Sequence, residues 1–308
     1  MPPETFTLFH YPLSPFSEKM RAMLGYAQLP WQSVAVKEMP PRPVLATLAG
    51  GYRKVPVAQL GADIFCDTHL IASEVAALSG KPLLAVEQCS ADVQAFVRET
   101  DMDIFLSCLL AGSGGGLLMK LVKSTSVIDT LKFLADRVAM GRKARVKAPS
   151  PRGAGAKLTA HLEGLEVRLQ AQPYLFGDEP CHADFSAYHS LWFVVDLAEK
   201  PLLVDFPKVR EWYLRMRSFN QPEVTALSAD QALINASQAE PRPLPANASD
   251  NLLLGQEISL APVDYGRDPV YGLLVAETPE RWIIAREDAQ VGTVHLHFPR
   301  QGFRVRAR

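Results

Sequence analysis

The pattern of apolar and polar positions divides the chain into a mixed first part, a helical middle part and a strand-rich last part. The first part opens with a predicted strand over Thr5–Tyr11. A helix is predicted over Phe16–Leu29, where apolar residues recur at helical spacing, and a strand over Trp31–Val36, where they alternate. Two short apolar runs, Val57–Leu60 and Ile64–Cys66, then predict an antiparallel hairpin.

Shorter helices complete the first part. A weak helix over Val44–Leu48 precedes the hairpin, and a helix over His69–Leu78 follows it. The predicted order is therefore β-α-β-α-β-β-α, in which a βαβ unit is followed by a hairpin and a helix. This is the thioredoxin-like arrangement, an α/β layer with a mixed sheet, and we assign it to residues 1–80.

The middle part, residues 88–235, is predicted to be an all-helical domain. Its long candidate helices are Ala91–Leu110, Leu117–Met140 and Ala156–Gln170. We interpret the glycine cluster Gly112–Gly116 as a loop, because a phosphate-binding loop would need a preceding strand and a following Lys-Ser or Lys-Thr pair. The basic run Arg142–Lys147 is expected to lie in a solvated loop.

A further informative stretch, Pro173–Val195, predicts the helix at the centre of this domain. Gly177 and Asp178 have the composition of a turn. Cys181 lies where a helix N-cap belongs, and Asp184, three residues later, can accept a hydrogen bond from its amide as in a capping box. We expect this helix to be structural, because the apolar residues that follow would form the core of the domain.

The last part follows a linker over Ser237–Asp250, which is rich in proline and small polar residues. Residues 250–308 then predict a small all-β domain, either a barrel or a curled sheet. Its predicted strands are Glu257–Leu260, Val270–Glu277, Arg281–Arg286, Gly292–Phe298 and Gly302–Arg306. His295 and His297 share one strand face, and a polar surface or a contact to another domain is favoured over zinc because no third ligand lies nearby.

Composition and charge limit the kinds of partner that the protein can have. The chain has 308 residues, of which 48% are hydrophobic and 21% charged, as in an ordinary globular protein. The net charge of -1 does not favour nucleic acid or an anionic membrane surface as a partner. No apolar run of about 18 residues predicts a membrane span, and the first residues lack the pattern of a signal peptide.

The cysteines point to a reducing compartment. Cys66, Cys89, Cys108 and Cys181 are widely spaced and form no CxxC pair. This spacing argues against a disulfide framework and against a zinc knuckle. A cytoplasmic location is therefore expected.

The stretch from Arg53 to Thr68 carries the candidate binding chemistry. Pro56 stands where the first hairpin strand begins, and the Val55-Pro56 bond is of the kind that can be cis. Asp67 and Thr68 follow the second strand and precede a helix, whose N-terminus is a natural seat for a carboxylate. These features predict a small ledge that binds a peptide.

Two groups of residues resemble the glutathione transferase superfamily. The first combines Ser14–Arg21 with Val55-Pro56 and Asp67-Thr68, and the second combines Tyr174–Asp178 with Ala183-Asp184. The resemblance covers about residues 5–230 and leaves the last β-domain outside it. It implies a thioredoxin-like domain followed by a helical domain, glutathione as co-substrate without a metal, and assembly as a homodimer.

The resemblance also implies a role for each matched position. Val55 would pair through its backbone with the cysteinyl part of glutathione, and Asp67 with Thr68 takes the place of the Glu-Ser pair that holds the γ-glutamyl group. Ser14 or Ser17 would activate the thiol. Cysteine-type members have Cys where this chain has Ser14, so mixed-disulfide chemistry lacks its nucleophile. The residues expected to contact glutathione are Tyr11, Phe16, Lys54, Val55, Pro56, Asp67 and Thr68.

Two functions remain open from the sequence. The first is a glutathione-dependent transferase, in which a hydroxyl at a helix N-terminus stabilises the thiolate for attack on a small electrophile. The second is a non-catalytic binding or adaptor protein that keeps the fold and uses its β-domain to contact a partner. The identity of the electrophile is not encoded in a recognisable motif.

Overall fold

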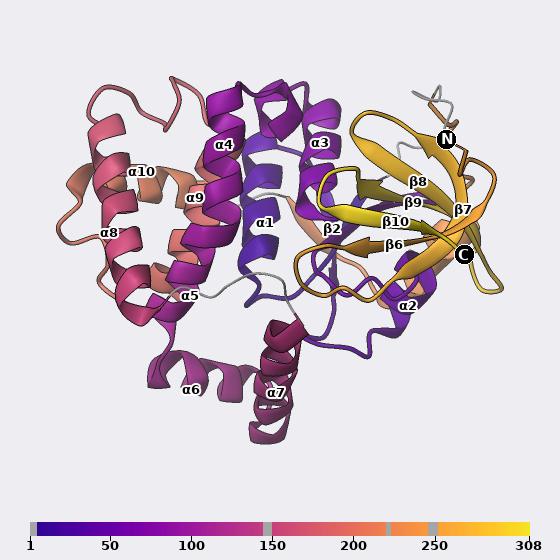
Figure 1. The fold of residues 1–308 in the computed structure, drawn as a ribbon, viewed down its shortest axis with the longest axis horizontal. Helices are drawn as coiled ribbons and strands as arrows, with labels where there is room; N and C mark the ends of the chain where they lie inside the picture. Colours follow the sequence, from indigo (N-terminus) through magenta and orange to yellow (C-terminus); the bar gives the residue numbers. More distant parts are fainter. Residues whose placement is uncertain (1–4, 144–149, 220–222, 246–251) are drawn as a thin grey trace.

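The computed structural model describes residues 5–143, 150–219, 223–245 and 252–308. Figure 1 shows the helices of the middle part gathered on one side of the molecule and the strands of the last part on the other. The first part lies between them. The fold class expected from the sequence is confirmed: an α/β thioredoxin-like part, a helical part and a strand-rich last part.

The first part has the predicted order, with boundaries that differ by a few residues. Its helix α1 begins at Pro15 because Ser14 caps it, and it ends where Gln28 adopts a left-handed conformation with φ 53°. Its elements are β1 (Phe6–His10), α1 (Pro15–Ala27), β2 (Trp31–Ala35), α2 (Pro43–Ala49), β3 (Val57–Leu60), β4 (Asp63–Cys66) and α3 (Thr68–Ser79).

Short 3-10 turns lead from α3 into the helical part. These turns are Pro82–Leu84 and Val86–Gln88. The helices are α4 (Ala91–Glu99), α5 (Phe105–Gly112), α6 (Gly115–Ser124), α7 (Val127–Lys143), α8 (Pro151–Arg168), α9 (His182–Trp192) and α10 (Pro207–Ser218), with π-helical turns at Thr100–Ile104 and Phe193–Leu197.

One helix prediction in this part was wrong. The single helix expected over Leu117–Met140 is two helices, α6 and α7. The chain breaks because the Thr125 hydroxyl bonds back to the Leu121 carbonyl at 2.8 Å, while the Ser126 hydroxyl accepts a hydrogen bond from the Asp129 amide at 3.0 Å and so starts the next helix. The loop predicted over Gly112–Gly116 is shorter than expected, because Gly112 ends α5, Gly115 begins α6, and Ser113 and Gly114 lie between them. The basic run was expected to lie in a loop, but Arg142 and Lys143 belong to α7, and residues 144–147 lie outside the described residues.

In the described part of the chain, no single helix has both the length and the apolar character to cross a membrane. The segments Ala91–Gly112 and Gly115–Ser124 meet that standard only when taken together, and they are bent by 91° relative to each other.

The capping box predicted at α9 is confirmed. The Cys181 amide donates to Asp184 Oδ2 at 3.0 Å. The other carboxylate oxygen accepts from the Leu175 amide and from the Trp212 indole, both at 2.9 Å. Asp184 is fully buried, and these donors satisfy its carboxylate. It therefore fastens the turn before α9 and helix α10 to the centre of the helical part.

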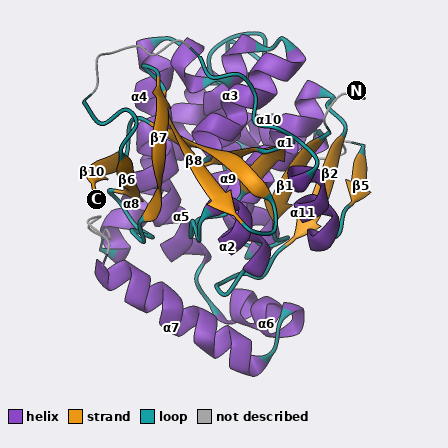
Figure 2. Ribbon diagram, turned by 90° about the vertical axis from the view of Figure 1, so that its right-hand side faces the viewer, coloured by secondary structure: helices purple, strands orange, loops and turns teal. Residues whose placement is uncertain are grey.

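The strands of the first and last parts form one sheet. Its ten strands run in the order β10-β6-β7-β8-β9-β4-β3-β1-β2-β5, and Figure 2 shows β10 and β5 at opposite edges. The strands predicted in the last part are all present, but they extend the first sheet and do not close into a barrel. They are β6 (Glu257–Pro262), β7 (Val270–Glu277), β8 (Arg281–Asp288), β9 (Gly292–Pro299) and β10 (Phe303–Ala307).

The chain reaches both edges of the first sheet after leaving the helical part. Strand β5 (Val224–Ala226) pairs in parallel with β2, and helix α11 (Ala229–Ser237) follows it. Strand β9 then pairs in parallel with β4 on the opposite side. Neither β5 nor α11 was predicted from the sequence. Because both former edges are paired, the last part is continuous with the first.

Two hydrophobic cores lie on the two faces of the first sheet. Side chains alternate between the two faces along β1, so Leu8 lies in one core and Phe9 lies in the other. The core around Leu8 is shared with α1, α3 and the helical part, whereas the core around Phe9 is shared with α2, α11 and the last strands. Each neighbouring part is thus anchored to a separate face of the same sheet.

A buried polar network fastens the last strands to the first part. His297 Nε2 lies 2.6 Å from Asp63 Oδ1, and the Arg242 amide donates to Asp63 Oδ2 at 2.8 Å. Glu74 of α3 pairs with Arg242 at 3.1 Å and with Arg281 at 2.8 Å. His297 therefore makes the contact to another part of the protein that its strand position suggested.

We predict that Gly272→Ala destabilises the protein. A Cβ at residue 272 in β7 would lie 2.7 Å from the backbone oxygen of Ala285 in β8, so the two strands must separate. The expected loss is about 1–3 kcal/mol of unfolding free energy, measured by urea denaturation. The control is Gly164→Ala in α8, where nothing lies near the added methyl. There the higher helix propensity of alanine should add up to about 1 kcal/mol. Equal stability of Gly272→Ala and the natural protein would contradict the close approach of β7 and β8.

Candidate functional site

Three strand ends meet at one edge of the sheet. In the register of the strands, Phe9 lies opposite Val57, and Val57 lies opposite Cys66. The residues just after β1, just before β3 and just after β4 are therefore neighbours. The structure brings together the sequence-predicted residues Tyr11, Ser14, Lys54, Val55, Pro56, Asp67 and Thr68.

The ledge predicted around Pro56 has the expected backbone features. The Val55-Pro56 peptide bond is cis. Asp67 has φ 86° and caps α3, accepting a hydrogen bond from the His69 amide at 3.1 Å. Thr68, the first residue of α3, is buried. A helix N-terminus thus faces the edge with its free amides and its partial positive charge.

Ser14 and Ser17 occupy different environments. Ser14 Oγ accepts a hydrogen bond from the Ser17 amide at 3.2 Å, as an N-cap does. The phenol of Tyr11 lies near Ser14, and burial raises the pKa of this phenol, so it stays neutral. Ser17 is fully buried, and its Oγ has no hydrogen-bond partner among the described residues. Ser14 therefore lies closer to the strand edge, and Ser17 lies inside α1.

Phe16 points toward the helical part. Its ring lies 4.8 Å from that of Phe105 and 4.8 Å from that of His189, measured between centroids. Phe16 is half-buried. It thus provides apolar surface where the first turn of α1 meets the helical part, beside the strand edge.

The loop between β6 and β7 covers this edge, which the sequence did not predict. Lys54 Nζ bonds both carboxylate oxygens of Asp264, at 2.8 and 2.9 Å, and lies 4.2 Å from the ring centre of Tyr265. Arg53 is paired with Asp136 of α7 and lies 3.7 Å from Asp268. Both cations next to the ledge are therefore neutralised by carboxylates that come from distant parts of the chain.

The charges at this edge are set by burial and by these neighbours. Burial disfavours the charge of Lys54, but Tyr265, Asp67 and Asp264 together raise its pKa, so it remains an ammonium. Burial raises the pKa of Tyr265 to about 12. The edge thus presents a paired cation and the neutral phenols of Tyr11 and Tyr265, which are hydrogen-bond donors at neutral pH.

Arg42 holds the backbone around the edge and was missed by the sequence reasoning. Its guanidinium donates to the carbonyls of Lys37, Glu38 and Arg53, at 2.7, 2.8 and 2.7 Å. Burial lowers the pKa of Arg42 to about 10, which leaves it charged at neutral pH. The Arg42 guanidinium therefore holds the backbone of Arg53, the residue just before Lys54. No local motif marks such a role, because the partners are main-chain atoms.

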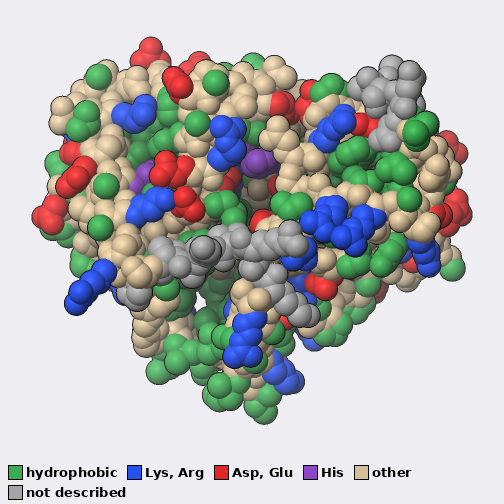
Figure 3. All heavy atoms as spheres, viewed as in Figure 1, with side chains coloured by type: hydrophobic (Ala, Val, Ile, Leu, Met, Phe, Trp, Pro, Cys, Tyr) green, Lys and Arg blue, Asp and Glu red, His purple; other side chains and the backbone are tan. Residues whose placement is uncertain are grey.

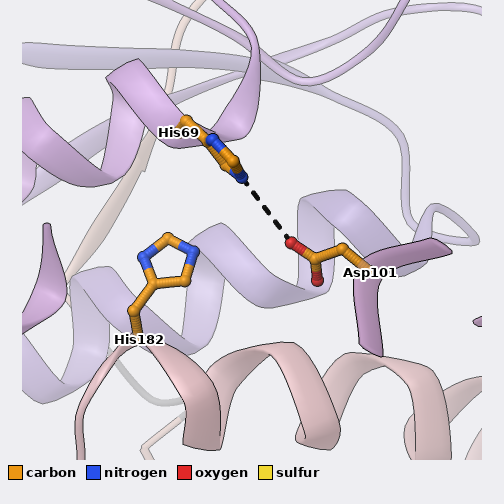
Figure 4. A group of neighbouring side chains, drawn as sticks. All are labelled: His69, Asp101 and His182. Atoms are coloured by element: carbon orange, nitrogen blue, oxygen red, sulfur yellow. Dashed lines mark ion pairs between the residues drawn. The ribbon is translucent and has the colours of Figure 1, made fainter. Parts of the chain in front are cut away.

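A second polar cluster lies between the first part and the helical part. The buried Lys19 ammonium of α1 contacts Asp101 Oδ2 at 2.8 Å, and His69 Nε2 lies 3.8 Å from the same oxygen. Figure 4 shows His69, Asp101 and His182 pointing toward one another from three different helical segments. Asp101 belongs to the π-helical turn between α4 and α5.

This cluster is the one group in the described residues with the spacing of a metal site. The ligand atoms of His69, Asp101 and His182 lie within 4.8 Å of one another. However, Lys19 already supplies a positive charge to the carboxylate. Burial alone would raise the pKa of Asp101, but Lys19 and the neighbouring histidines hold it well below its usual range. We interpret the cluster as a buried ion pair that joins two parts of the protein.

Comparisons with known proteins agree with this arrangement. The family described as glutathione S-transferase, N-terminal domain, matches residues 8–82, and glutathione S-transferase, C-terminal domain, matches residues 143–215. The solved structure of a GST-like protein from Pseudomonas syringae is 31% identical, with a TM-score of 0.79, and the match covers 99% of this chain and 100% of that one.

Two other solved structures are less similar. A glutathione S-transferase from Rhodospirillum rubrum is 21% identical over 71% of this chain and 90% of that one, with a TM-score of 0.48. A glutathione transferase family member from Pseudomonas fluorescens, with two glutathione bound, is 17% identical over 71% and 94% of the two chains, with a TM-score of 0.48. No curated protein matches the sequence.

We predict that Lys19→Met destabilises the protein by about 3–5 kcal/mol, because it leaves the Asp101 carboxylate buried without its cation. The double variant Lys19→Met with Asp101→Asn should lose less unfolding free energy than Lys19→Met alone, because it removes both charges. Urea denaturation at neutral pH measures both. The control is Lys208→Met, which breaks an exposed pair with Glu211 at 3.0 Å and should cost less than about 1 kcal/mol. Similar losses for Lys19→Met and Lys208→Met would show that the buried pair does not join the two parts.

Proposed function

This chain belongs to the glutathione S-transferase superfamily, and we propose that it binds glutathione at the strand edge and transfers its thiolate to a small electrophile. One observation carries the proposal: a single edge of the sheet holds the cis Val55-Pro56 bond, the N-terminus of α3 at Asp67 and the N-cap Ser14 of α1. The backbone beside the cis bond can pair with the main chain of a peptide. The N-terminus of α3 can bind a charged amino-acid group, and Ser14 provides a hydroxyl.

In this proposal, glutathione lies along the edge with its cysteinyl part at Val55 and its γ-glutamyl end at Asp67. Its cysteinyl backbone pairs with Val55, beside the cis proline. Its γ-glutamyl end, which carries both an ammonium and a carboxylate, meets Asp67 and the free amides of α3, so that each charge has an opposite one. Lys54 contributes a positive charge at the edge, for which a carboxylate of the ligand competes with Asp264.

Ser14 is the proposed activating residue. A thiol with a pKa of about 8.5 is mostly protonated at neutral pH. A hydroxyl that donates to the sulfur at a helix N-terminus favours the thiolate, which is the nucleophile. Ser14 Oγ already accepts from the Ser17 amide, which leaves its own hydrogen for donation. Phe16 and Phe105 give an apolar wall beside it, which suits an apolar electrophile.

We also propose that the protein works in the cytoplasm as a homodimer. The four cysteines are all free and buried, which suits a reducing compartment. The family implies dimerisation, and sedimentation velocity of the purified protein tests it. A single monomeric species at micromolar concentration would exclude the dimer.

We predict that Ser14→Ala lowers kcat/KM by about 10- to 100-fold, as the loss of a hydrogen bond to a charged group would. The apparent pKa of bound glutathione, followed by the ultraviolet absorbance of the thiolate, should rise toward about 8.5. Glutathione affinity should change little.

The matched comparison for this prediction is Ser17→Ala, which removes a hydroxyl that is buried inside α1. It should keep turnover. Full activity of both variants would rule out both serines as activators. Binding of glutathione by the natural protein, without turnover of any of a panel of electrophiles, would support the non-catalytic binding or adaptor function instead.

We predict that Asp264→Asn strengthens glutathione binding about two- to fivefold, because it frees Lys54 from its own carboxylate. Isothermal titration calorimetry with glutathione measures the change. The control is Asp205→Asn, which removes the same charge from an exposed position in the helical part and should leave affinity unchanged. Weaker binding by Asp264→Asn would show that the loop supports the ligand and does not compete with it.

A further inference from the structure

Two arginines of β10 lie side by side on the outer face of the sheet. Strand β10 pairs with β6 so that Arg304 lies opposite Ala261 and Arg306 opposite Ser259. Ser259 in turn lies opposite Tyr271 of β7. Residues opposite each other in an antiparallel pair point to the same face, so both guanidinium groups, the Ser259 hydroxyl and the Tyr271 ring share one face. The alternate residues of these strands belong to the core or pack against it.

A third arginine approaches from the loop between β6 and β7. Arg267 joins Arg304, Arg306, Ser259 and Tyr271 in lining a cavity of about 240 Å³. The other lining residues are alanine and prolines, so the described residues place no carboxylate at this wall. Figure 3 shows a prominent group of Lys and Arg side chains over β6 and β10, on the face turned to the viewer.

Elsewhere in the described part of the chain, several arginines are paired with carboxylates, in contrast to Arg267, Arg304 and Arg306. Arg53, Arg242 and Arg281 each pair with an acidic side chain. Within the described residues, no ion pair or side-chain hydrogen bond is formed by Arg267, Arg304 or Arg306. The Arg267 Nε is moreover buried without a hydrogen-bond partner in the described part of the chain. A buried donor on a guanidinium is costly unless an acceptor meets it.

We propose that this cavity binds the phosphate group of a small phosphorylated compound. A guanidinium presents its N–H donors in a fork that matches the spacing of phosphate oxygens, and three such forks surround one space. The hydroxyls of Ser259 and Tyr271 add neutral donors at the same wall.

The size of the cavity and the charge of the chain favour a small ligand over a polymer. At about 240 Å³, the cavity is smaller than a typical pocket for a drug-sized molecule and suits a phosphate with a short organic part. The net charge of the chain is -1, which does not favour a nucleic-acid polymer as the ligand. The cavity shares the loop between β6 and β7 with the strand edge proposed for glutathione, but none of its lining residues is proposed to contact glutathione, so its test does not depend on that function.

The test is calorimetric titration of the full chain at low ionic strength with two probes, inorganic phosphate and glycerol phosphate. We expect saturable binding with one site per chain that weakens as sodium chloride is added. Arg304→Gln with Arg306→Gln should weaken binding at least about tenfold, as the loss of charge-assisted hydrogen bonds requires. Tighter binding of glycerol phosphate than of phosphate would identify an organic phosphate as the ligand, whereas equal binding would identify the free anion.

Two further variants make the result specific. Arg210→Gln removes one charge from an exposed position on α10 and should leave phosphate affinity unchanged. Arg304→Lys keeps the charge but not the fork, and should bind phosphate more weakly than the natural protein. Thermal unfolding midpoints establish that each variant is folded. The proposal fails if phosphate binding is absent, if Arg304→Gln with Arg306→Gln binds as well as Arg210→Gln, or if single-stranded RNA or anionic vesicles bind at this face and phosphate does not.

Discussion

The buried ion pair between Lys19 and Asp101 sets the relation between the strand edge and the helical part. Lys19 lies on α1, the helix whose N-cap is Ser14, and Asp101 lies on the π-helical turn between α4 and α5. Because a buried charge without a partner costs several kcal/mol, the helical part cannot shift along α1 without breaking the pair or carrying it along. The Tyr188 hydroxyl adds a second fixed contact by donating to Glu18 Oε1 at 2.9 Å. The hydroxyl of Ser14 and the apolar wall at Phe16 are thereby held in one arrangement.

The strand edge is built from every part of the chain. The first part provides its backbone, α7 provides Asp136, and the loop between β6 and β7 provides Asp264, Tyr265 and Asp268. The loop between β6 and β7 reaches the strand edge because β9 pairs with β4 and so joins the last strands to the first sheet. The additional β-strands are therefore part of the architecture of the site, in contrast to a separate body joined by a linker.

Local patterns explain why much of the fold was predictable. Alternating spacing identified every strand except β5, helical spacing identified several of the helices, and the residues around Pro56 and Asp67 indicated a strand start and a helix start. The same patterns could not reveal β5, because its residues Val224, Thr225 and Ala226 are all exposed and carry no alternation. The local patterns also identified β9 as a strand, but they did not indicate which strand it pairs with. Pairing of β4 with β9 depends on contacts between residues far apart in sequence, which periodicity does not encode.

The same limit applies to the site. The backbone features around residues 55 and 67 are local, and they were inferred from proline and from a helix start. The carboxylate on Lys54 comes from a residue 210 positions away, and a charged residue in a loop has no signature of its distant partner. Arg42 was missed for a related reason, since it binds main-chain carbonyls that any residue provides.

The position of β9 has a consequence for how the protein is made. Strand β4 is synthesised before the helical part, whereas the strand that covers its outer edge is synthesised after the helical part, since Ile64 pairs with Leu296. Throughout synthesis of the helical part, β4 is an open edge with unpaired amides and carbonyls, the kind of edge that recruits strands from other chains. The nascent chain can complete its sheet only after β9 has been synthesised, so that a ribosome stalled before β9 carries an exposed strand.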